Sequence, residues 1–299
     1  MSVEMTVERF ERHRDLLTGV AYRILGTVAD AEDVVQEAWL RWSGVDVGVV
    51  EDDRAYLIRV TTRLSIDRLR RIGARRESYA GEWLPEPVAT GADVAERVEL
   101  TTSVELALLV VLETLSPLER AVFVLREAFG LPYAEIGEAI GRTEATARQL
   151  SRRARRHVEE RRPRFEVDRA RRREITERFI GAAVDGDLEG LVSMLAADAT
   201  LVGDGGGKVR APLRSIVGAD KIARLLVSIA SETGARRFLE SIGLTEADGI
   251  TVEFPEINGA PAAVITAGGQ VITLLSLVVR DGLIETIYLV VNPDKLSRL

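Results

Sequence analysis

The stretch "LPYAEIGEAIGRTEATARQLSRRARRHVEERR", residues 131–162, constrains the fold of this chain most strongly. Its apolar spacing predicts a short helix over Tyr133–Ile140, a turn at Gly141, and a second helix capped by Thr143. Two sets of side chains separate on these helices. The inward set is Ile136, Ile140, Ala147, Leu150 and Ala154, and the outward set is Ala145, Arg148, Gln149, Arg152 and Arg156.

A short helix, a glycine turn and a second helix with a basic outer face are typical of a DNA-binding helix-turn-helix. Arg148 can pair with guanine and Gln149 with adenine, while Arg152, Arg153 and Arg156 suit phosphates. The alternative is a plain helical hairpin with a solvated arginine face. Because the turn, the buried spacing and the basic second helix agree, we favour DNA binding.

The charge distribution supports the same interpretation. The 299 residues carry a net charge of −7, which by itself disfavours a nucleic-acid partner. Arginines nevertheless concentrate in Arg59–Arg76 and Arg148–Arg173, whereas the lysines, Lys208, Lys221 and Lys295, all lie in the second half. Two basic clusters on an acidic chain indicate nucleic-acid binding better than the total excludes it.

The chain is long enough for two or three domains, and its patterns divide it into four segments. Residues 1–77 read as helices, one capped at Asp30 and another over about Arg54–Arg71. Residues 78–103 read as a linker, 104–163 as helices again, and 164–299 as an α+β domain. That last domain should contain a short strand Thr200–Val202 and three consecutive antiparallel strands. These are Ala262–Thr266, Gln270–Val279 and Leu283–Val291, with hairpin turns at Gly268-Gly269 and Asp281-Gly282.

Two features of these segments bear on function. The helix over Arg54–Arg71 carries one polar stripe, made of Tyr56, Arg59, Arg63, Asp67 and Arg70. The linker contains "WLPEP", residues 83–87, whose Trp83 and Leu84 are large apolar groups that a merely solvated linker would avoid. We therefore expect another part of the chain to receive them.

The stretch "LVGDGGGKVRAP", residues 201–212, suggests a phosphate-binding loop but does not satisfy its pattern. That loop needs a glycine at position 202 and a hydroxyl residue at position 209, but this chain has Val202 and Val209 there. It also needs a helix that begins directly after the lysine, which Pro212 disfavours. One alternative is a flexible turn, and another is a bare backbone that a second segment approaches closely. We favour the second, with Lys208 pairing with an acid such as Glu86.

Several classes of protein are disfavoured. The N-terminus is charged from its fourth residue, no apolar run approaches a membrane span, and cysteine is absent. We expect a cytoplasmic protein that contacts no membrane, with no metal site and no cofactor.

Three strings together, in this order and spacing, resemble a bacterial sigma factor of the extracytoplasmic-function (ECF) type. They are "DAEDVVQEAWLRW", "AYLIRVTTRLSIDRLRR" and "LSPLERAVFVLREAFGLPYAEIGEAIGRTEATARQLSRRARR". The first two resemble sigma domain two and the third resembles sigma domain four. "WLPEP", "DGGGK" and the terminal "NPDKL" further resemble the subgroup with a C-terminal SnoaL-like extension, a cone-shaped α+β fold that acts as a built-in regulator.

This resemblance implies partners and site residues. Core RNA polymerase would bind the acidic and polar face of the helix that begins at Asp30. This face consists of Asp30, Asp33, Gln36, Glu37 and Arg41. Promoter DNA would meet the stripe Tyr56, Arg59, Arg63, Asp67 and Arg70 at its −10 element. The −35 element would meet the second helix of the helix-turn-helix, at Thr143, Glu144, Arg148, Gln149, Arg152, Arg153 and Arg156. The proposed regulatory contact joins Trp83, Leu84, Pro85, Glu86, Pro87, Asp204, Gly205, Gly206, Gly207, Lys208, Asn292, Pro293, Asp294, Lys295 and Leu296.

The alternative function is a helix-turn-helix regulator fused to a ligand-binding or enzymatic SnoaL-like domain. Such cones also serve as isomerases and cyclases, in which a buried Asp or His is the general base. The histidines, His13 and His157, lie outside this domain, and we expect its acid candidates Asp198 and Asp204 to be exposed in turns. We therefore assign no catalytic residue, although an unknown small ligand in the cone stays possible.

Overall fold

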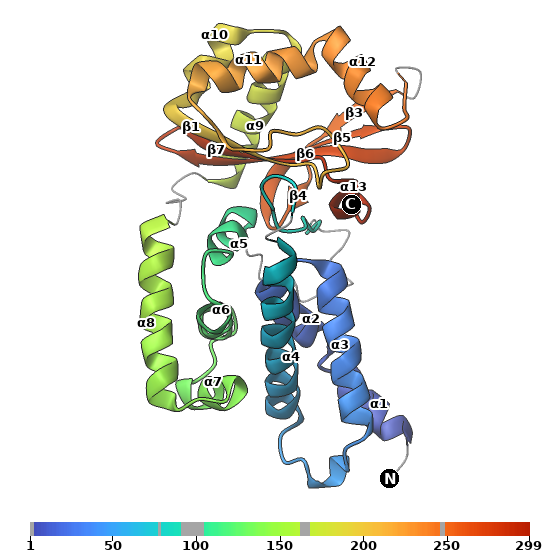
Figure 1. The fold of residues 1–299 in the computed structure, drawn as a ribbon, viewed down its shortest axis with the longest axis vertical. Coiled ribbons are helices and arrows are strands. Elements are labelled where there is room, and N and C mark those ends of the chain that lie inside the picture. The colour runs from blue at the N-terminus through green and yellow to red at the C-terminus, as the bar shows by residue number, and fades with distance from the viewer. Residues whose placement is uncertain (1–2, 77–78, 91–104, 162–167, 246–248) are drawn as a thin grey trace. The chain divides into compact units, whose positions relative to one another are not determined.

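The chain divides into two compact units in the computed structural model, which describes residues 3–76, 79–90, 105–161, 168–245 and 249–299 (Figure 1). The first unit contains Met1–Glu77 and Ala92–Arg162, and the second contains Ser78–Gly91 and Pro163–Leu299. The expected linker 78–103 is thus split, because its first part, including "WLPEP", belongs to the second unit. Residues 91–104, the rest of that linker, lie outside the described residues.

The described part of the first unit is helical, as its periodicity predicts. Its elements are α1 (Val3–Glu11), α2 (Arg14–Leu25), α3 (Val28–Ser43), the 3-10 helix η1 (Val47–Val49), α4 (Asp53–Arg76), α5 (Leu106–Leu112), α6 (Pro117–Phe123), the π-helical turn η4 (Val124–Ala128), α7 (Tyr133–Ile140) and α8 (Glu144–Arg161).

Helices α2, α3 and α4 pack against one another around fully buried apolar side chains such as Leu17, Ile24 and Leu57. Trp42 of α3 is also fully buried, and its indole Nε1 donates to the Thr6 carbonyl at 2.9 Å. That hydrogen bond satisfies the one polar atom of a side chain that otherwise belongs in the core.

The start of α3 corrects one expectation. Its N-cap is Thr27, which has an extended backbone, and Asp30 lies within the first turn of the helix. The Thr27 hydroxyl donates to the Asp30 carboxylate at 2.5 Å. Asp30 therefore contributes a negative charge near the positive end of the helix dipole rather than the cap itself. Helix α4 is also longer than the expected Arg54–Arg71.

The helix-turn-helix forms where the sequence predicts it. Helix α7 spans Tyr133–Ile140, Gly141 adopts a left-handed backbone with φ +67°, and α8 begins at Glu144. The Thr143 hydroxyl accepts from the Thr146 amide at 3.2 Å, as an N-cap does. A Cβ added to Gly137 would lie 2.9 Å from the Arg142 carbonyl oxygen, so α7 and the start of α8 approach too closely for any larger residue.

The second unit has the α+β architecture expected of a SnoaL-like domain. Its elements are α9 (Arg169–Val184), α10 (Leu188–Met194), β1 (Leu195–Asp204), β2 (Ile216–Val217), α11 (Ala219–Ala230), α12 (Glu232–Ser241), β3 (Ile250–Glu253), β4 (Glu256–Ile257), β5 (Ala260–Ala267), β6 (Gln270–Arg280), β7 (Leu283–Val290) and α13 (Pro293–Leu296). The strand expected at Thr200–Val202 is the centre of the longer β1.

The described strands form one sheet in the order β2-β1-β7-β6-β5-β3, with β4 paired to β5. Strands β5, β6 and β7 are antiparallel neighbours, and Gly268, Gly269, Asp281 and Gly282 in the two hairpin turns have positive φ. Strand β1 instead runs parallel to β7, although it lies far away in sequence. This pairing brings the end of β1 beside the end of β7, where Asp204 lies opposite Val290.

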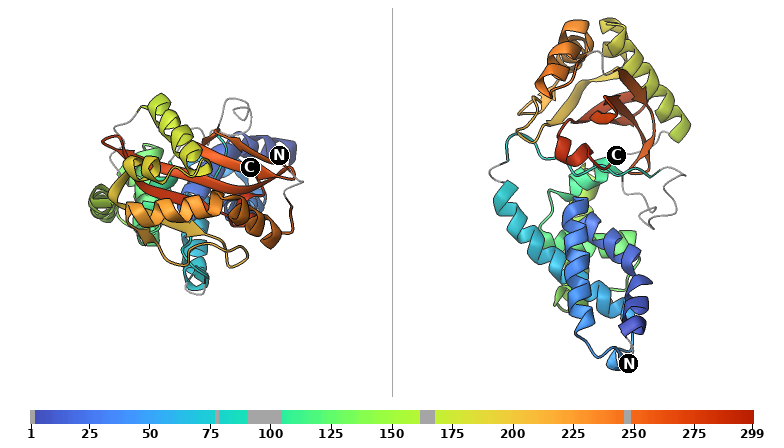
Figure 2. Two further views of the ribbon diagram at one scale, coloured as in Figure 1. Left: turned by 90° about the horizontal axis from the view of Figure 1, so that it is seen from above. Right: turned by 90° about the vertical axis from the view of Figure 1, so that its right-hand side faces the viewer.

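Helices α9, α11 and α12 lie along one face of the sheet and α13 on the other side (Figure 1). Seen from above, α9 and α11 cross the strands as two separate helices (Figure 2). Between these helices and the sheet lies the apolar core, which includes Phe179, Leu201, Ile222 and Ile287, all with no exposed surface. Within the described residues, no helix combines the length and the apolar character that crossing a membrane requires.

Candidate nucleic-acid interface and buried contact network

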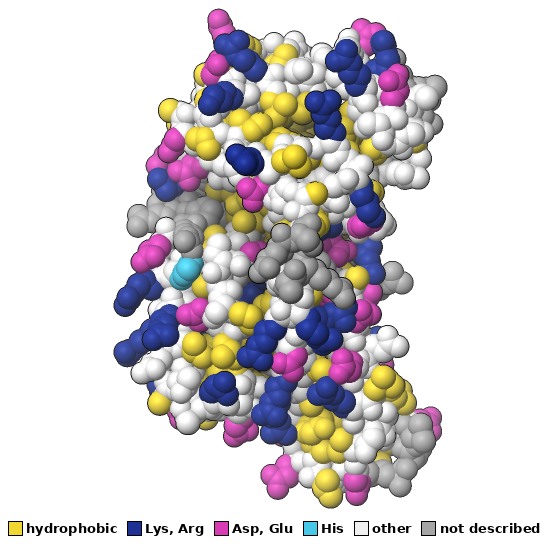
Figure 3. All heavy atoms as spheres, in the orientation of Figure 1, with side chains coloured by type: hydrophobic (Ala, Val, Ile, Leu, Met, Phe, Trp, Pro, Cys, Tyr) yellow, Lys and Arg dark blue, Asp and Glu magenta, His cyan; other side chains and the backbone are white. Residues whose placement is uncertain are grey.

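The outer face of α8 is basic and exposed. The residues assigned to it by sequence all lie at exposed positions: Thr143, Glu144, Arg148, Gln149, Arg152, Arg153 and Arg156. Opposite them, Ala147 and Ala154 are fully buried, so the helix has one face in the core and one in solvent. Arginine side chains, dark blue in the space-filling view, gather over α4 and α8 (Figure 3).

Arg148 is held in place by two neighbours. Its guanidinium pairs with the Glu144 carboxylate one turn earlier and lies 4.9 Å from the centre of the Tyr133 ring. Sequence reasoning did not identify Tyr133, which sits at the start of α7. A base or phosphate that takes Arg148 must compete with the Glu144 carboxylate, while the ring can keep the guanidinium in position.

The polar stripe of α4 combines an aromatic ring with charges. Tyr56 is half-buried, with its ring 5.6 Å from the Trp42 ring and under the Arg59 guanidinium at 5.4 Å. Further along the helix, Asp67 and Arg70 are exposed and pair at 3.1 Å. The stripe therefore offers a partly exposed ring and several cations on one face of a single helix.

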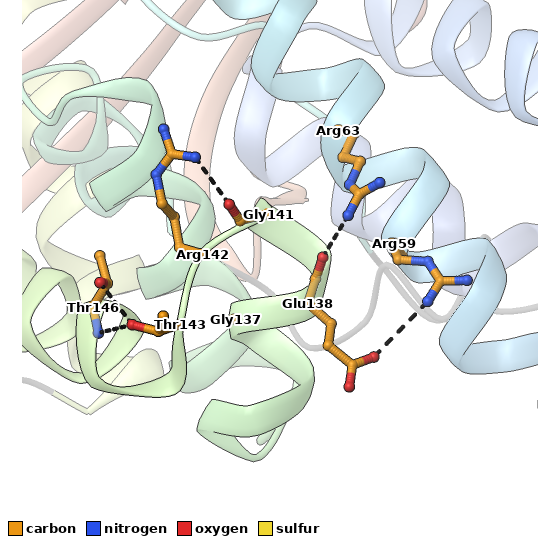
Figure 4. Close-up of a pocket in the computed structure, with 8 residues that line it drawn as sticks. All are labelled: Arg59, Arg63, Gly137, Glu138, Gly141, Arg142, Thr143 and Thr146. Carbon is orange, nitrogen blue, oxygen red and sulfur yellow. Dashed lines mark hydrogen bonds and ion pairs between the residues drawn. The ribbon is translucent and has the colours of Figure 1, made fainter.

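Between α4 and α7 lies a groove of about 580 Å³ (Figure 4). It is lined by Arg59, Arg63, Gly137, Glu138, Gly141, Arg142, Thr143 and Thr146. Arg63 donates from Nη2 to the Glu138 carbonyl at 2.8 Å and from Nε to the Ala139 carbonyl at 3.2 Å. Two side chains of the α4 stripe thus face the first helix of the helix-turn-helix.

The outer face of α3 carries the residues assigned to polymerase binding. Asp33, Gln36 and Arg41 are exposed, and Glu37 pairs with Arg41 at 2.8 Å. Asp30 and Asp33 both accept hydrogen bonds from Arg68 of α4, each at 2.6 Å. Sequence reasoning missed this internal role.

It also missed Leu40 on the same helix, whose exposed fraction of 63% is unusual for a leucine. Its position outside the apolar set that faces the core was the available signal.

In the second unit, Asp204 at the end of β1 is the centre of a buried network. The residue has no exposed surface, so the expectation of an exposed turn acid is wrong. Its Oδ1 accepts from the Tyr79 hydroxyl at 2.5 Å and the Gly206 amide at 3.0 Å, and its Oδ2 from the Leu84 amide at 2.9 Å. The Lys295 Nζ, also buried, donates to Oδ2 at 2.6 Å. A buried carboxylate is tolerable here because a cation and three neutral donors surround it.

Lys295 ties together the three motifs. Besides Asp204, it donates to the Leu84 carbonyl, and its Nζ lies 4.0 Å from the centre of the Trp83 ring. "WLPEP", "DGGGK" and "NPDKL" therefore meet at one ammonium group. The second unit thus packs against the apolar residues of this segment. Four residues of the segment are buried, namely Leu84, Pro85, Glu86 and Pro87.

Two of the three glycines, Gly206 and Gly207, make room for this contact. Gly206 and Gly207 have φ of +63° and +71°. A Cβ on Gly206 would lie 2.5 Å from the Asn292 Nδ2, and one on Gly207 would lie 3.0 Å from the Ala80 Cβ. The glycines thus permit both the backbone turn and the close approach of the neighbouring segments.

The expected pairing of Lys208 with Glu86 is wrong. Lys208 instead pairs with Asp294, the residue after the start of α13, at 2.7 Å, and both side chains are more than half exposed. Glu86 is buried, and Arg298 lies 3.8 Å from its carboxylate. The Lys208 ammonium is directed to Asp294 of α13, and Arg298 is the cation that lies beside Glu86.

Sequence reasoning also missed Tyr79 and the residues after "WLPEP". The Tyr79 hydroxyl accepts from Asn292 Nδ2 at 2.9 Å, and burial, together with its hydrogen bond to Asp204, raises the pKa of Tyr79 well above its usual value. Val88 exchanges hydrogen bonds with Asn258, and Ala89 bridges to Ile257. An aromatic residue close to Trp83 was the one signal in the sequence for the Tyr79 contact.

Comparison with known proteins places these surfaces in a family. The family models for Sigma-70 region 2 and Sigma-70, region 4 match residues 9–76 and 105–158, the segments that carry the α4 stripe and the α8 face. ECF RNA polymerase sigma factor SigJ of Mycobacterium tuberculosis is 40% identical over 98% of this chain and 94% of its own length. The probable ECF sigma factor SigI of the same species is 35% identical, over 96% of this chain and 93% of its own length.

A solved structure agrees with this assignment. The crystal structure of M. tuberculosis SigJ superposes with a TM-score of 0.75 at 37% identity and covers 98% of both chains. A chain with sigma regions two and four followed by an α+β domain is a transcription initiation factor. This chain belongs to the extracytoplasmic-function sigma factors, which confirms the family and the fold class expected from its sequence.

Proposed function

We propose that the three exposed faces of the first unit divide the work of initiation, with α3 on core RNA polymerase, the α4 stripe on the −10 element and α8 on the −35 element. The observation that carries the proposal is the α8 face, where exposed arginines and Gln149 follow a tight, threonine-capped turn within the match to sigma region four. Such a face suits the major groove. The protein would act in the cytoplasm, as a binding factor and not as an enzyme.

The polymerase surface on α3 has both polar and apolar parts. Glu37 and Arg41 supply charges that can re-pair across an interface, and the exposed Leu40 supplies apolar area beside them. Asp30 and Asp33 act differently, since Arg68 already holds both carboxylates. Their main role in this proposal is to fix α3 against α4, so that the two binding faces keep one mutual orientation.

The α4 stripe suits opened DNA. A stacking ring at Tyr56 and cations at Arg59, Arg63 and Arg70 are what a single strand needs, namely a platform for a base and partners for its phosphates. Asp67 pairs with Arg70 and so orients that guanidinium.

The second unit would regulate the first in cis. The chain leaves the first unit after α4, enters the second at Ser78–Gly91, and returns to the first before α5. The connection between the two sigma regions is therefore anchored in the Asp204–Lys295 network. We infer that this anchor limits how far the two regions can separate on a promoter.

A catalytic role for the second unit finds less support. Asp204, one of the two acid candidates, is buried, but both of its carboxylate oxygens already accept hydrogen bonds from Tyr79, Leu84, Gly206 and Lys295. A general base needs a free oxygen that a substrate can reach. Asp198, the other candidate, is exposed on β1.

Run-off transcription with core polymerase tests the assignment of α8. Arg148→Ala should lower the yield from the cognate promoter at least severalfold, because a bidentate base contact is worth about 1–3 kcal/mol. Arg155→Ala is the matched control, since Arg155 lies on the same helix but pairs with Glu127 of η4. Equal yields from the two variants would contradict the assignment.

A further inference from the structure

The groove between α4 and α7 contains an arrangement that the proposed function leaves unexplained. Arg59 and Arg63 belong to the stripe proposed for promoter DNA, yet both point at the last turn of α7 (Figure 4). Arg63 donates to two consecutive backbone carbonyls, those of Glu138 and Ala139. Arg59 lies 3.8 Å from the Glu138 carboxylate. The promoter-facing cations are thus already engaged within the chain.

The last turn of a helix is a natural acceptor for arginine. Its final carbonyls lack the amides of a further turn, and the aligned peptide dipoles give that end a partial negative charge. In α7 the Glu138 carbonyl accepts from the Gly141 amide at 3.2 Å as well as from Arg63. In α7, the Glu138 carboxylate adds a full negative charge beside these carbonyls. Several acceptor oxygens with net negative charge, facing two guanidinium groups, reproduce what a backbone phosphate presents to arginine.

We propose that the C-terminal end of α7 is a phosphate mimic, which occupies Arg59 and Arg63 until nucleic acid displaces it. This inference rests on the proposed role of the α4 stripe in binding promoter DNA, and it adds a competitor built into the chain. The rest of the groove supports displacement by an anion. Arg142, Thr143 and Thr146 also line it. The Arg142 guanidinium donates to the Gly141 carbonyl and the two threonine hydroxyls bond to each other, so an entering phosphate finds further polar groups that can exchange partners.

The strength of the contact suits a competitor. Arg59 and Glu138 are both substantially exposed, with side-chain exposed fractions of 37% and 72%, and exposed ion pairs are weak and screened by salt. A nucleic-acid strand, with a charge at every phosphate, can therefore displace the α7 end. Because the contact is weak, one charge change on α7 should measurably alter how often Arg59 and Arg63 are bound to the α7 end.

The test modifies Glu138 in the full chain. Glu138→Gln removes the charge that faces Arg59, and Glu138→Lys places a like charge between the two arginines. Glu135→Gln is the matched control, because Glu135 is a half-buried acid on the same helix that does not line the groove. Phenylglyoxal modification, quantified residue by residue by mass spectrometry, reports how well Arg59 and Arg63 are protected relative to Arg70 on the same stripe.

We expect Glu138→Gln to raise the modification rate of Arg59 about twofold to fivefold, the range of an exposed ion pair. Glu138→Lys should raise the rates of both Arg59 and Arg63, and Glu135→Gln should change neither. If Arg59 and Arg63 react with phenylglyoxal at the same rates in both Glu138 variants as in the chain without substitutions, the proposal is overturned. Circular dichroism of each variant would show whether the helices are retained, and Glu138→Gln keeps the test decisive if the lysine variant does not fold.

Fluorescence anisotropy with a short single-stranded DNA separates this inference from the proposed function. If the α4 stripe binds DNA, Arg63→Ala weakens binding, and if α7 competes, Glu138→Gln strengthens it. A loss with Arg63→Ala but no gain with Glu138→Gln would leave the stripe as a DNA site and refute the mimic. No effect of Arg63→Ala would refute the role of the stripe itself, whatever the modification rates show.

Discussion

At the scale of single residues, Asp204 shows what sequence cannot reveal. The glycines that follow it suggest an exposed turn, and the resemblance groups three motifs without indicating which of their atoms meet the Asp204 carboxylate. Two of its partners are Leu84, 120 positions earlier, and Lys295, 91 positions later. Burial of a charge depends on groups that only the folded chain brings together, so the local pattern leads to the wrong environment. The involvement of the three motifs could be expected, but their geometry could not.

We predict that Lys295→Met destabilises the second unit by about 3 kcal/mol, because it leaves the fully buried Asp204 without its cation. The methionine fills a similar volume, so the loss reflects charge more than packing. Hydrogen exchange of the amides in the neighbouring strands β1 and β7 would measure the free energy of opening.

Lys208→Met provides the control for this prediction. It also removes a lysine that pairs with an aspartate, but this pair is more than half exposed on both sides. Its loss should therefore cost less than about 1 kcal/mol. Similar costs for the two substitutions would show that the Lys295 pair contributes no more than a surface ion pair.

At the scale of elements, the sequence predicts local structure well and distant pairing poorly. Helix α7, the Gly141 turn and the start of α8 follow from the spacing of apolar residues and from a glycine and a threonine nearby. The hairpin turns between β5, β6 and β7 likewise lie within their own loops. By contrast, the parallel pairing of β1 with β7, and the docking of residues 84–90 beside Asn258, depend on contacts far apart in the chain.

The helix-turn-helix nevertheless contains a constraint that sequence reasoning missed. Gly137 is helical and has an ordinary φ. Glycine is required at this position only because there is no room for a side chain. We predict that Gly137→Ala distorts the turn and weakens binding to duplex promoter DNA, because the new methyl group would press on the backbone of Arg142, Thr143 and Glu144. The expected cost is about 1–3 kcal/mol of stability in the first unit, measured by thermal unfolding alongside DNA binding.

Gly73→Ala is the matched comparison, since Gly73 is also helical and a Cβ there meets no atom within 4 Å. Alanine has the higher helix propensity, so this variant should gain up to about 1 kcal/mol. A loss at Gly73 as large as that at Gly137 would mean that crowding is not the cause.

At the scale of the whole molecule, the path of the chain matters most. It passes through the first unit, the second, the first again and the second again. The segment Ser78–Gly91 belongs to the second unit but lies between the two sigma regions in sequence. The second unit therefore holds the connection between these regions at Leu84 and Val88. Helix α13, close to the end of the chain, supplies Lys295 to this contact and is packed beside β6. A change at the C-terminus should therefore reach the segment between the sigma regions.

We predict that ending the chain after Val291 releases this segment and changes transcription from the cognate promoter, while the sheet stays folded. The truncation removes Asn292 and Lys295, which hold Tyr79 and Leu84, but leaves every strand in place. Hydrogen exchange should quicken most at the Leu84 and Val88 amides, while the amides of β6 and β7 should quicken no more than they do in Lys295→Met. A full-length chain with Lys208→Met keeps α13 and should behave like the unmodified protein.

If the segment exchanges faster yet run-off transcription is unaltered, the anchor is structural and does not regulate the sigma regions. If exchange at Leu84 is unaltered, the contacts from α13 do not hold the segment, and regulation must use the Asp204 contacts alone.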